Sequence, residues 1–476
     1  MNSAGETGRR GEDGGRGGLH AVVVGGSLAG LLAAHVLAGH ADRVTVVERD
    51  RFPEGAEPRS GVPQGRHPHV LLQGGQVAME SLLPGFLAEL SEAGAPRVGM
   101  PADMVLWQSG RWFRRLPATT HIYTGSRAQL EHLVRRRVLA DPAIGVQEGT
   151  DVVGLVGDAT RVRGVLMRDR SGDNRAEPRL LEADLVVDAS GSGTKAPRWL
   201  EAIGARVPDE ETIDTGLAYA SRVYRGTNGA LEGETRGYYA YPDPEQVHAG
   251  GALPLEDGTH LVIVSGLRGD EPPTEDAEFV TYTKRLPHPP LHRWLDQAEP
   301  LSPAFGYRRT ANTRRRYDLP GHPAGFLATG DALCTFNPIY GQGMAVAAMS
   351  AVALRDALAD RRRTPTTRRV QQALLAASRQ AWDISAGADR KMPGAVGTAI
   401  DGGPADRLAG WYLSRVQQRA PGDPVVGQAF RAVLTLAAPV TALFAPSVAR
   451  AVLFGPPAPT PTEPPAAPEE PEAHGR

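Results

Sequence analysis

The segment VVVGGSLAG near the start of the chain narrows the choice of fold most, because it joins an apolar strand to a helix through a glycine turn. Residues 20–25 predict a strand, residues 28–38 a helix and residues 43–48 a second strand. Two strands joined through a helix form a βαβ unit, in which the strands run parallel. The sequence therefore predicts an α/β fold that begins with a Rossmann-like domain.

The turn of this unit carries the glycine spacing of a dinucleotide-binding site. Gly25 and Gly30 occupy the outer positions of G-x-G-x-x-G, and Ser27 takes the middle one. Gly25 permits the tight turn and Gly30 lets the helix approach the sheet, so that free N–H groups of the helix can face a pyrophosphate. Glu48 ends the second strand 18 residues after Gly30, where a carboxylate can accept hydrogen bonds from ribose hydroxyls.

Composition excludes several other classes of protein. The 476 residues carry a net charge of −2, which leaves no basic surplus for nucleic-acid binding. The single cysteine, Cys334, excludes a disulfide framework and thiolate zinc sites. Residues 1–18 are rich in glycine and charge and lack the apolar core of a signal peptide, so we expect a disordered tail on a soluble, cytoplasmic protein. The Pro- and Glu-rich residues 455–476 are also expected to be disordered.

An uncharged stretch at residues 432–449 raises the question of a membrane span. Pro439 and Pro446 interrupt it, and alanine supplies much of its length. These features favour a buried or interfacial helical segment. We therefore expect no spanning segment, while peripheral contact with a membrane stays open.

A second site signal lies far later in the chain. Gly330 and Asp331 follow the apolar strand GFLAT, and a loop rich in Pro and Gly then leads into an Ala-rich helix. Asp331 can accept hydrogen bonds from a ribityl chain, and N–H groups around residues 341–344 can stabilise negative charge on a reduced flavin ring. With ADLVVDASGSG between the two signals, the combination predicts one extended cofactor held by distant segments.

These motifs resemble those of the flavoprotein monooxygenases of the aromatic-hydroxylase type, over roughly residues 19–360. The resemblance implies that the helix after Gly25 binds the FAD pyrophosphate, Glu48 the adenosine ribose and Asp331 the ribityl chain. Asp188 belongs to the central motif of that family, which here continues with Ala189 instead of the usual glycine. The resemblance assigns further cofactor-binding residues to several loops: Arg49, Arg59, Val62, Arg127, Val153, Gly341, Gly343 and Met344.

Longer strings make the resemblance narrower. ERDRFP, RSGVPQGRHPHVLLQGG, LVVDASG and GDALCTFNPIYGQGM are similar to strings in the epoxidases of polyether-antibiotic biosynthesis, such as those of lasalocid and monensin, which resemble squalene epoxidases. The resemblance implies a monooxygenase of secondary metabolism that epoxidises C=C bonds of a polyketide- or terpenoid-like intermediate through a flavin C4a-hydroperoxide. An aromatic hydroxylase, a geranylgeranyl-reductase-like enzyme and a non-catalytic flavin protein remain as alternatives.

The implied reaction determines the cofactors and partners. FAD is the cofactor, O2 the co-substrate, and NAD(P)H or a partner flavin reductase the electron source. The substrate is a small apolar alkene, held between the loop at 338–343, residues 59–64 and an inserted sheet. Tyr238, Tyr239 and Tyr241 are expected to line the pocket or form sheet core, with Tyr239 facing opposite to the other two. Because the chemistry belongs to the cofactor, we expect no catalytic side chain and no metal.

The histidines and the cysteine near these motifs have ordinary explanations. His67 and His69 are expected to be loop or pocket-wall residues, because no Cys/His/Asp set accompanies them. Cys334 is expected to be a buried, inert thiol, although a reactive one close to the flavin is the alternative.

The predicted organisation of the chain has six segments. Between the two tails lie a discontinuous FAD-binding domain, an inserted β-sheet substrate domain and a helical C-terminal region. Their predicted boundaries are 1–18 for the first tail, 19–204 and 321–360 for the FAD-binding domain, 205–320 for the substrate domain, 361–454 for the helical region and 455–476 for the second tail.

Overall fold

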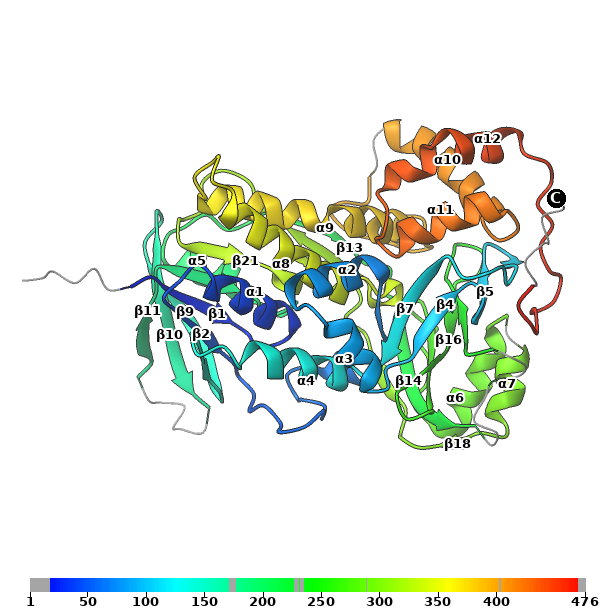
Figure 1. Cartoon of the computed structure of the whole chain (residues 1–476), viewed down its shortest axis with the longest axis horizontal. Helices are drawn as coiled ribbons and strands as arrows, with labels where there is room; N and C mark the ends of the chain where they lie inside the picture. The colour runs from blue at the N-terminus through cyan, green and yellow to red at the C-terminus, as the bar shows by residue number, and fades with distance from the viewer. Residues whose placement is uncertain are drawn as a thin grey trace, which may run out of the picture.

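The computed structural model describes residues 18–170, 177–226, 231, 235–287, 289–401 and 404–469. The predicted disorder of residues 1–18 falls almost entirely outside this range. Figure 1 shows a parallel sheet and its helices at one end of the molecule, a large sheet at the other, and the C-terminal helices above the large sheet. The predicted α/β fold, with a Rossmann-like domain, an added sheet and C-terminal helices, is confirmed.

The predicted βαβ unit consists of β1 (His20–Val24), α1 (Leu28–Ala38) and β2 (Arg43–Val47). All residues of β1 are buried, as expected for a strand covered on both faces. The five strands of its sheet are all parallel, in the order β21-β12-β1-β2-β8. The strands that complete it are β8 (Ile144–Gln147), β12 (Leu185–Asp188) and β21 (Phe326–Ala328).

The chain thus returns to its first sheet through β21, after the large sheet has been built. Directly afterwards α8 (Gly343–Ala359) packs against α1 and α2 (Gln73–Leu82). The N-termini of α1 and α8, which are more than 300 residues apart, are thereby placed beside one groove. This arrangement is what the two distant glycine motifs require.

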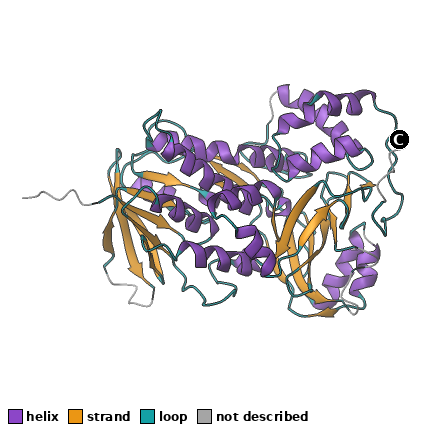
Figure 2. Cartoon of the chain, in the orientation of Figure 1, coloured by secondary structure: helices purple, strands orange, loops and turns teal. Residues whose placement is uncertain are grey.

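Short sheets and helices surround this core (Figure 2). Three small sheets pair β9 (Thr150–Gly157), β10 (Val162–Asp169) and β11 (Arg179–Glu182); β13 (Glu210–Ile213), β20 (Asn312–Arg315) and β22 (Cys334–Thr335); and β3 (His69–Leu71), β4 (Arg97–Met100) and β7 (Thr120–Gly125). The helices are α3 (Phe86–Glu92), α4 (Arg127–Val138), α5 (Ala196–Ala202) and the short turns η1 (Pro63–Arg66), η3 (Gly330–Ala332) and η4 (Pro338–Tyr340).

The large sheet has eight strands and is antiparallel except where β15 meets β5. Its strands are β5 (Met104–Gln108), β6 (Arg111–Trp112), β14 (Ala218–Arg225), β15 (Gly237–Ala240), β16 (Ala249–Pro254), β17 (His260–Gly266), β18 (Glu299–Pro300) and β19 (Phe305–Tyr307). Two of them, β5 and β6, come from the range that the sequence assigned to the first FAD-binding segment. Sequence patterning did not separate them because both are short and precede the main run of strands.

The two faces of this sheet have different neighbours. One face packs on α6 (Asp276–Tyr282), η2 (Thr283–Arg285) and α7 (Pro289–Leu295), and Tyr238 is part of this apolar cluster. Tyr239 and Tyr241 line a cavity on the other face. The prediction that Tyr239 faces opposite to both other tyrosines is therefore wrong. Residues 239 and 241 are two positions apart and share a face, as the alternation of a strand requires.

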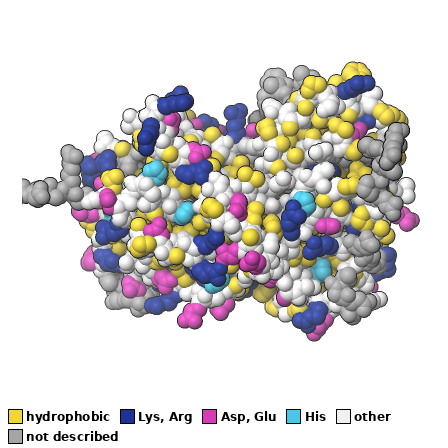
Figure 3. Space-filling view, in the orientation of Figure 1, with side chains coloured by type: hydrophobic (Ala, Val, Ile, Leu, Met, Phe, Trp, Pro, Cys, Tyr) yellow, Lys and Arg dark blue, Asp and Glu magenta, His cyan; other side chains and the backbone are white. Residues whose placement is uncertain are grey.

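The C-terminal region consists of α9 (Thr367–Asp389), α10 (Pro404–Arg419), α11 (Pro424–Leu434), η5 (Val440–Phe444) and α12 (Pro446–Phe454). The uncharged stretch at 432–449 is divided among the last three of these elements. Within the described ranges, no helix has the length and apolar character needed to cross a membrane. The side chains of Trp411, Phe444 and Phe454 are exposed, and Figure 3 shows hydrophobic side chains gathered over these helices.

The structure differs from the expected disorder of residues 455–476 over the part that it describes. Residues 455–469 run back toward the large sheet, where the carbonyl of Ala466 accepts a hydrogen bond from Arg115 Nη1 at 2.8 Å. The carboxylate of Glu469 accepts a hydrogen bond from Arg114 Nε at 2.9 Å. Proline-rich composition predicts a chain without its own core, but such a chain can still dock on arginines of the loop that follows β6.

Candidate functional site

A groove of about 350 Å³ runs between the N-termini of α1 and α8. Gly25 has φ +101°, and a Cβ there would lie 2.6 Å from the carbonyl oxygen of Ala189. A Cβ on Gly30 would lie only 1.8 Å from the carbonyl oxygen of Gly25. The hydroxyl of Ser27 donates to Glu131 Oε2 at 2.9 Å instead of capping the helix. The first N–H groups of α1 therefore remain available for an anionic ligand such as a pyrophosphate.

Glu48 lies at the edge of this groove, at the end of β2. Its Oε2 accepts a hydrogen bond from the N–H of Gly26 at 2.7 Å, and its Oε1 accepts one from the N–H of Asp50 at 2.9 Å. These bonds fix the carboxylate beside the glycine turn. Carboxylate oxygens have further lone pairs for ribose hydroxyls, so the position fits the predicted role.

Two predicted cofactor residues, Arg59 and Arg127, meet at a carboxylate that sequence reasoning missed. Arg59 Nη2 lies 2.6 Å from Glu131 Oε1, and Arg127 Nη2 lies 3.3 Å from Glu131 Oε2. Arg59 also lies 3.4 Å from Glu48, and Arg127 donates to Ser27 Oγ at 2.9 Å. The signal that could have found Glu131 is its i,i+4 spacing from Arg127 on α4.

The surroundings of Glu131 keep it ionised. Burial opposes its ionisation, but Arg127 and Arg59 outweigh burial and lower the pKa of the carboxyl. Because the folded-state pKa lies below the unfolded value of about 4.3, the ionised carboxylate stabilises the fold at any pH above about 4.3. This stabilisation is lost as the pH falls through the folded-state pKa.

We expect the substitution Glu131→Gln to lower the free energy of unfolding near neutral pH. The difference in this free energy between variant and wild type should become smaller below about pH 4. Urea denaturation at a series of pH values measures both effects. Glu299→Gln is the matched control, because the Arg225–Glu299 pair is 57% and 63% exposed and contributes little. A difference that stays constant from neutral to acidic pH would contradict the assignment.

The second half of the groove is formed by the return segment. Asp331 lines it, and burial raises the pKa of this carboxyl while Arg127 and Arg315 act in the opposite direction. Gly341, Gly343 and Met344 line the groove at the start of α8. Gly341 has φ +67°, which explains glycine at this turn.

A buried network holds the loop that leads into α8. Asp389, at the end of α9, accepts hydrogen bonds from Asn312 Nδ2 at 2.6 Å, Asn337 Nδ2 at 2.9 Å and Tyr340 Oη at 2.6 Å. Burial raises the pKa of Asp389, although these donors act in the opposite direction. Tyr239 Oη donates to the carbonyl of Ile339 at 3.0 Å. The loop at 337–341 is thereby fixed from α9 and from the large sheet.

The groove brings together most of the predicted cofactor residues, namely Gly25, Ser27, Glu48, Arg49, Arg59, Val62, Arg127, Asp331, Gly341, Gly343 and Met344. Three predicted residues do not line it. Gly30 supports the groove from within α1. Val153 turns away while Val152 lines the wall, because successive strand residues face opposite sides. Asp188 is fully buried and accepts hydrogen bonds from the N–H and Oγ of Ser190, so it holds the loop after β12 rather than facing the groove.

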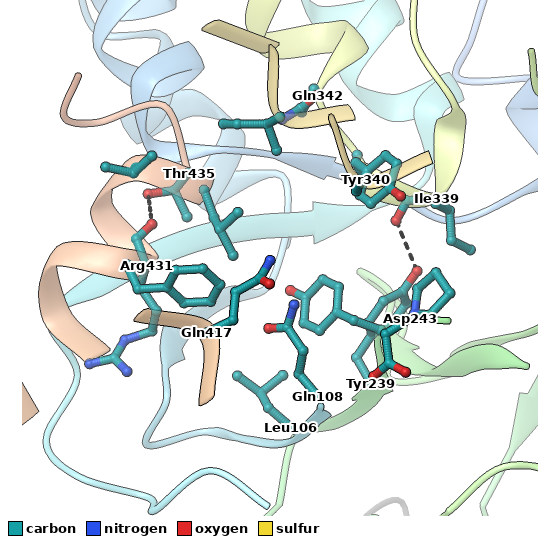
Figure 4. A pocket seen from close by; sticks show the side chains of 18 of the residues that line it. Leu106, Gln108, Tyr239, Asp243, Ile339, Tyr340, Gln342, Gln417, Arg431 and Thr435 are labelled. Atoms are coloured by element: carbon teal, nitrogen blue, oxygen red, sulfur yellow. Dashed lines mark hydrogen bonds between the residues drawn. The ribbon is translucent and has the colours of Figure 1, made fainter. Parts of the chain in front are cut away.

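A second cavity, of about 660 Å³, adjoins the groove. Its floor is the large sheet, with Leu106, Tyr239 and Ile263, and one side is the loop at 338–342. Figure 4 shows side chains from these segments facing others from the C-terminal helices. The lining residues shared by groove and cavity are His67, Pro68, Val70, Tyr219, Pro338, Gly341 and Gln342.

The predicted pocket therefore has the expected loop and sheet but a different third wall. Residues 59–64 line the groove only. In their place α10 and α11 supply Leu413, Val416 and Phe430. We call this wall, formed by α10 and α11, the lid of the cavity. Sequence reasoning missed the lid because the matched motifs end before it.

His67 lies where groove and cavity meet. Its ring is 4.7 Å from that of Tyr219, and its Nδ1 is 3.0 Å from Ser221 Oγ. Burial lowers the pKa of His67 to about 4, helped by Arg66, so the imidazole is neutral. Of the residues that the structure describes, no three His, Cys, Asp or Glu side chains gather in a way that could hold a metal.

Cys334 lies in β22 and is 2% exposed. Burial raises the pKa of its thiol to about 12, which keeps it protonated and unreactive at neutral pH. It does not line the groove or the adjoining cavity. Its placement agrees with an inert core thiol.

The groove fits FAD on features of its own residues. Glycines at the turn leave room for a phosphate, and two helix N-termini face the same space. Oε1 of Gln342, at the start of α8, is buried with no hydrogen-bond partner among the described residues. Nε of Arg127 is in the same situation. A ligand with phosphates at one end and polar ring atoms at the other can supply these partners.

Comparisons with known proteins agree with this geometry. The sequence model of the FAD binding domain family matches residues 19–382. Protein Rv3254 of Mycobacterium tuberculosis is 37% identical over 352 residues, which cover 71% of this chain and 73% of that protein.

Solved structures share the fold at low sequence identity. The p-nitrophenol 4-monooxygenase PnpA from Pseudomonas putida has a TM-score of 0.61 at 16% identity, covering 88% of this chain and 98% of that one. The flavin-dependent brominase Bmp2 has a TM-score of 0.57 at 16% identity, covering 87% and 93%. Since the family match spans most of the chain, the protein belongs to the FAD binding domain family.

Proposed function

We propose that this chain is an epoxidase that transfers one oxygen atom of O2 to a C=C bond of a polyketide- or terpenoid-like substrate. The observation that carries the proposal is the 660 Å³ cavity, mainly apolar, which shares wall residues with the FAD groove. Cavities of this size enclose most of the surface of a ligand of moderate size. FAD, when bound and reduced, supplies the activation of O2 and the electrophilic oxygen.

The chain itself positions the substrate and excludes water. Leu106, Ile263 and Phe430 form an apolar part of the cavity wall, so an alkene is held there by apolar contact. Hydrogen bonds from Tyr239 and to Asp389 keep the loop beside the ring site in one conformation. In this proposal NAD(P)H or a partner reductase delivers the electrons, and no side chain acts as a nucleophile.

The proposal also includes two inferences from the sequence: the division into domains and a peripheral contact with a membrane surface. Residues 19–204 and 321–360 form the FAD-binding part, with β5 and β6 now added to the substrate sheet. Contact of α10–α12 with a membrane surface is supported by the exposed side chains of Trp411, Phe444 and Phe454.

Isotope labelling tests the reaction. The FAD-loaded protein is reduced with dithionite without O2 and then mixed with ¹⁸O2 and the linear triene farnesol. It is expected to form an epoxide that contains one ¹⁸O atom, while the two electrons of the reduced flavin and two protons convert the other atom to water. The physical reason is that an electron-rich, isolated alkene is the group that an apolar cavity can bring to an electrophilic oxygen. Mass spectrometry of the product measures the label, and chelation with EDTA is expected to leave the rate unchanged.

Two other results would move the assignment. If farnesol stayed unlabelled while a phenol supplied in its place gained one ¹⁸O atom, the protein would be an aromatic hydroxylase on the same scaffold. A saturated product formed without O2 consumption would identify a reductase.

A further inference from the structure

Three neutral polar side chains lie among the residues that line the cavity. Gln108 is the last residue of β5. Tyr241 comes directly after β15, the strand that pairs with β5, and Gln417 lies on α10 in the opposite wall. The N–H of Tyr241 donates to the carbonyl of Trp107 at 3.0 Å, which sets Tyr241 beside Gln108. In Figure 4 the amides of Gln108 and Gln417 point toward each other across the cavity.

These side chains have polar atoms that the protein does not use. Oε1 of Gln108 is buried with no hydrogen-bond partner among the described residues. Within the same ranges, neither the amide of Gln417 nor the hydroxyl of Tyr241 makes a hydrogen bond. An unpartnered buried amide oxygen is unfavourable unless a ligand or water satisfies it, and the half-buried side chains of Tyr241 and Gln417 leave polar atoms available to the same ligand.

Two charged residues of the same cavity, Asp243 and Arg431, are engaged by neighbouring groups of the protein. The carboxylate of Asp243 accepts the N–H of Ser109 at 3.0 Å, and Arg431 Nη2 donates to Thr119 Oγ1 at 3.1 Å. In Figure 4 the guanidinium of Arg431 points away from Gln417. The remaining charged residues lie along or just beyond the last turns of α9, at least partly exposed: Arg379, Asp383, Arg390 and Lys391.

We infer that Gln108, Tyr241 and Gln417 bind a neutral oxygen function of the substrate, a hydroxyl, carbonyl or ether. The inference rests on the proposed function, which makes the alkene the reacting group. It adds the substrate class: an apolar alkene that also carries an uncharged hydroxyl, carbonyl or ether group. Each amide offers both donor and acceptor atoms, and burial raises the pKa of Tyr241 to about 12, so its hydroxyl stays protonated. Gln417 lies on the lid, so the same contact joins lid and sheet across the ligand.

The three groups select against two other ligand classes. A pure hydrocarbon would leave the amides unpaired, and a site built for hydrogen bonding rejects analogues that lack the polar group. A carboxylate would lose its hydration without meeting a cation at this point of the cavity. Selectivity between ligands with the same carbon skeleton is therefore the property to measure.

The test compares farnesol, β-farnesene and farnesoic acid at pH 8 on the FAD-loaded protein. Quenching of tryptophan fluorescence gives the dissociation constants, since Trp107 adjoins Gln108. Farnesol is expected to bind about 10-fold more tightly than the hydrocarbon, equivalent to about 1.4 kcal/mol, and more tightly than the acid. Gln108→Leu and Gln417→Leu should each reduce the preference over the hydrocarbon to about 3-fold or less.

Leu413→Val is the matched control on α10, because it changes the volume of the same wall without changing its polarity. It should shift the affinity for all three probes together. Equal binding of farnesol and β-farnesene by wild type, tightest binding of the acid, or an unchanged preference in both glutamine variants would overturn the inference. Since binding is measured without turnover, the preference can hold even if no epoxide forms, which separates this inference from the proposed reaction.

Discussion

Replacing Gly30 with alanine is expected to weaken FAD binding by about two orders of magnitude or more. A Cβ at this position would lie 1.8 Å from the carbonyl oxygen and 2.9 Å from the carbonyl carbon of Gly25. Both atoms belong to the backbone, so relief requires α1 to move away from the turn that faces the pyrophosphate. We expect a loss of about 3 kcal/mol or more, which corresponds to a Kd at least about 100-fold weaker. Titration of the apoprotein with FAD, followed by flavin fluorescence, measures it.

Gly39→Ala supplies the control at the other end of the same helix. Its Cβ would lie 3.5 Å from the carbonyl of Val36, an ordinary contact, and its φ of −81° suits any residue. This variant should bind FAD like wild type. If Gly30→Ala also bound FAD normally, the close approach of α1 to the turn would not be what forms the site.

Replacing Arg59 with methionine is expected to cause the largest loss of stability among single substitutions at the site. The guanidinium is 4% exposed and lies within 3.5 Å of carboxylate oxygens of Glu131, Glu48 and Asp50. Removing it leaves buried carboxylates with one cation fewer. Breaking a buried ion pair from one side costs about 3–5 kcal/mol, so the free energy of unfolding in urea should fall by that amount.

The same substitution at Arg225 distinguishes burial from charge. Arg225 lies 3.0 Å from Glu299, but its side chain is 57% exposed. Arg225→Met should change the free energy of unfolding by less than about 1 kcal/mol. A similarly small effect of Arg59→Met would show that Arg127 alone can balance the buried negative charge of Glu131.

Local geometry explains why the first half of the site could be predicted from sequence. The turn at Gly25, the packing of Gly30 and the end of β2 at Glu48 all lie within one βαβ unit, where chain connectivity fixes the distances. The second half, around Asp331, was predictable because a strand, a turn and a helix follow each other in the same order. In both cases the residue type and its place at an element's end determine the role.

Tertiary contacts explain the remainder. Glu131 lies 72 residues from Arg59, so no spacing rule connects them. The difference between Val152 and Val153 is a single step of strand phase, which depends on the pairing of β9 with β10. Asp188 matches the central motif of the resembled family, yet its carboxylate accepts hydrogen bonds from Ser190 and Thr194 under the loop. The lid from α10 and α11 has no motif, because apolar helices that close a cavity look like any amphipathic helices.

The position of this lid in the sequence has a consequence for how such enzymes diversify. The matched family segment ends at residue 382, whereas Leu413, Val416, Gln417 and Phe430 lie beyond it. The cofactor groove is therefore encoded in one stretch of the gene, and part of the wall of the adjoining cavity in another. Insertions, deletions or exchanges in the last part of the coding sequence can alter ligand choice while the redox half stays intact. Chimeras that swap this part between relatives are thus a natural route to new substrates.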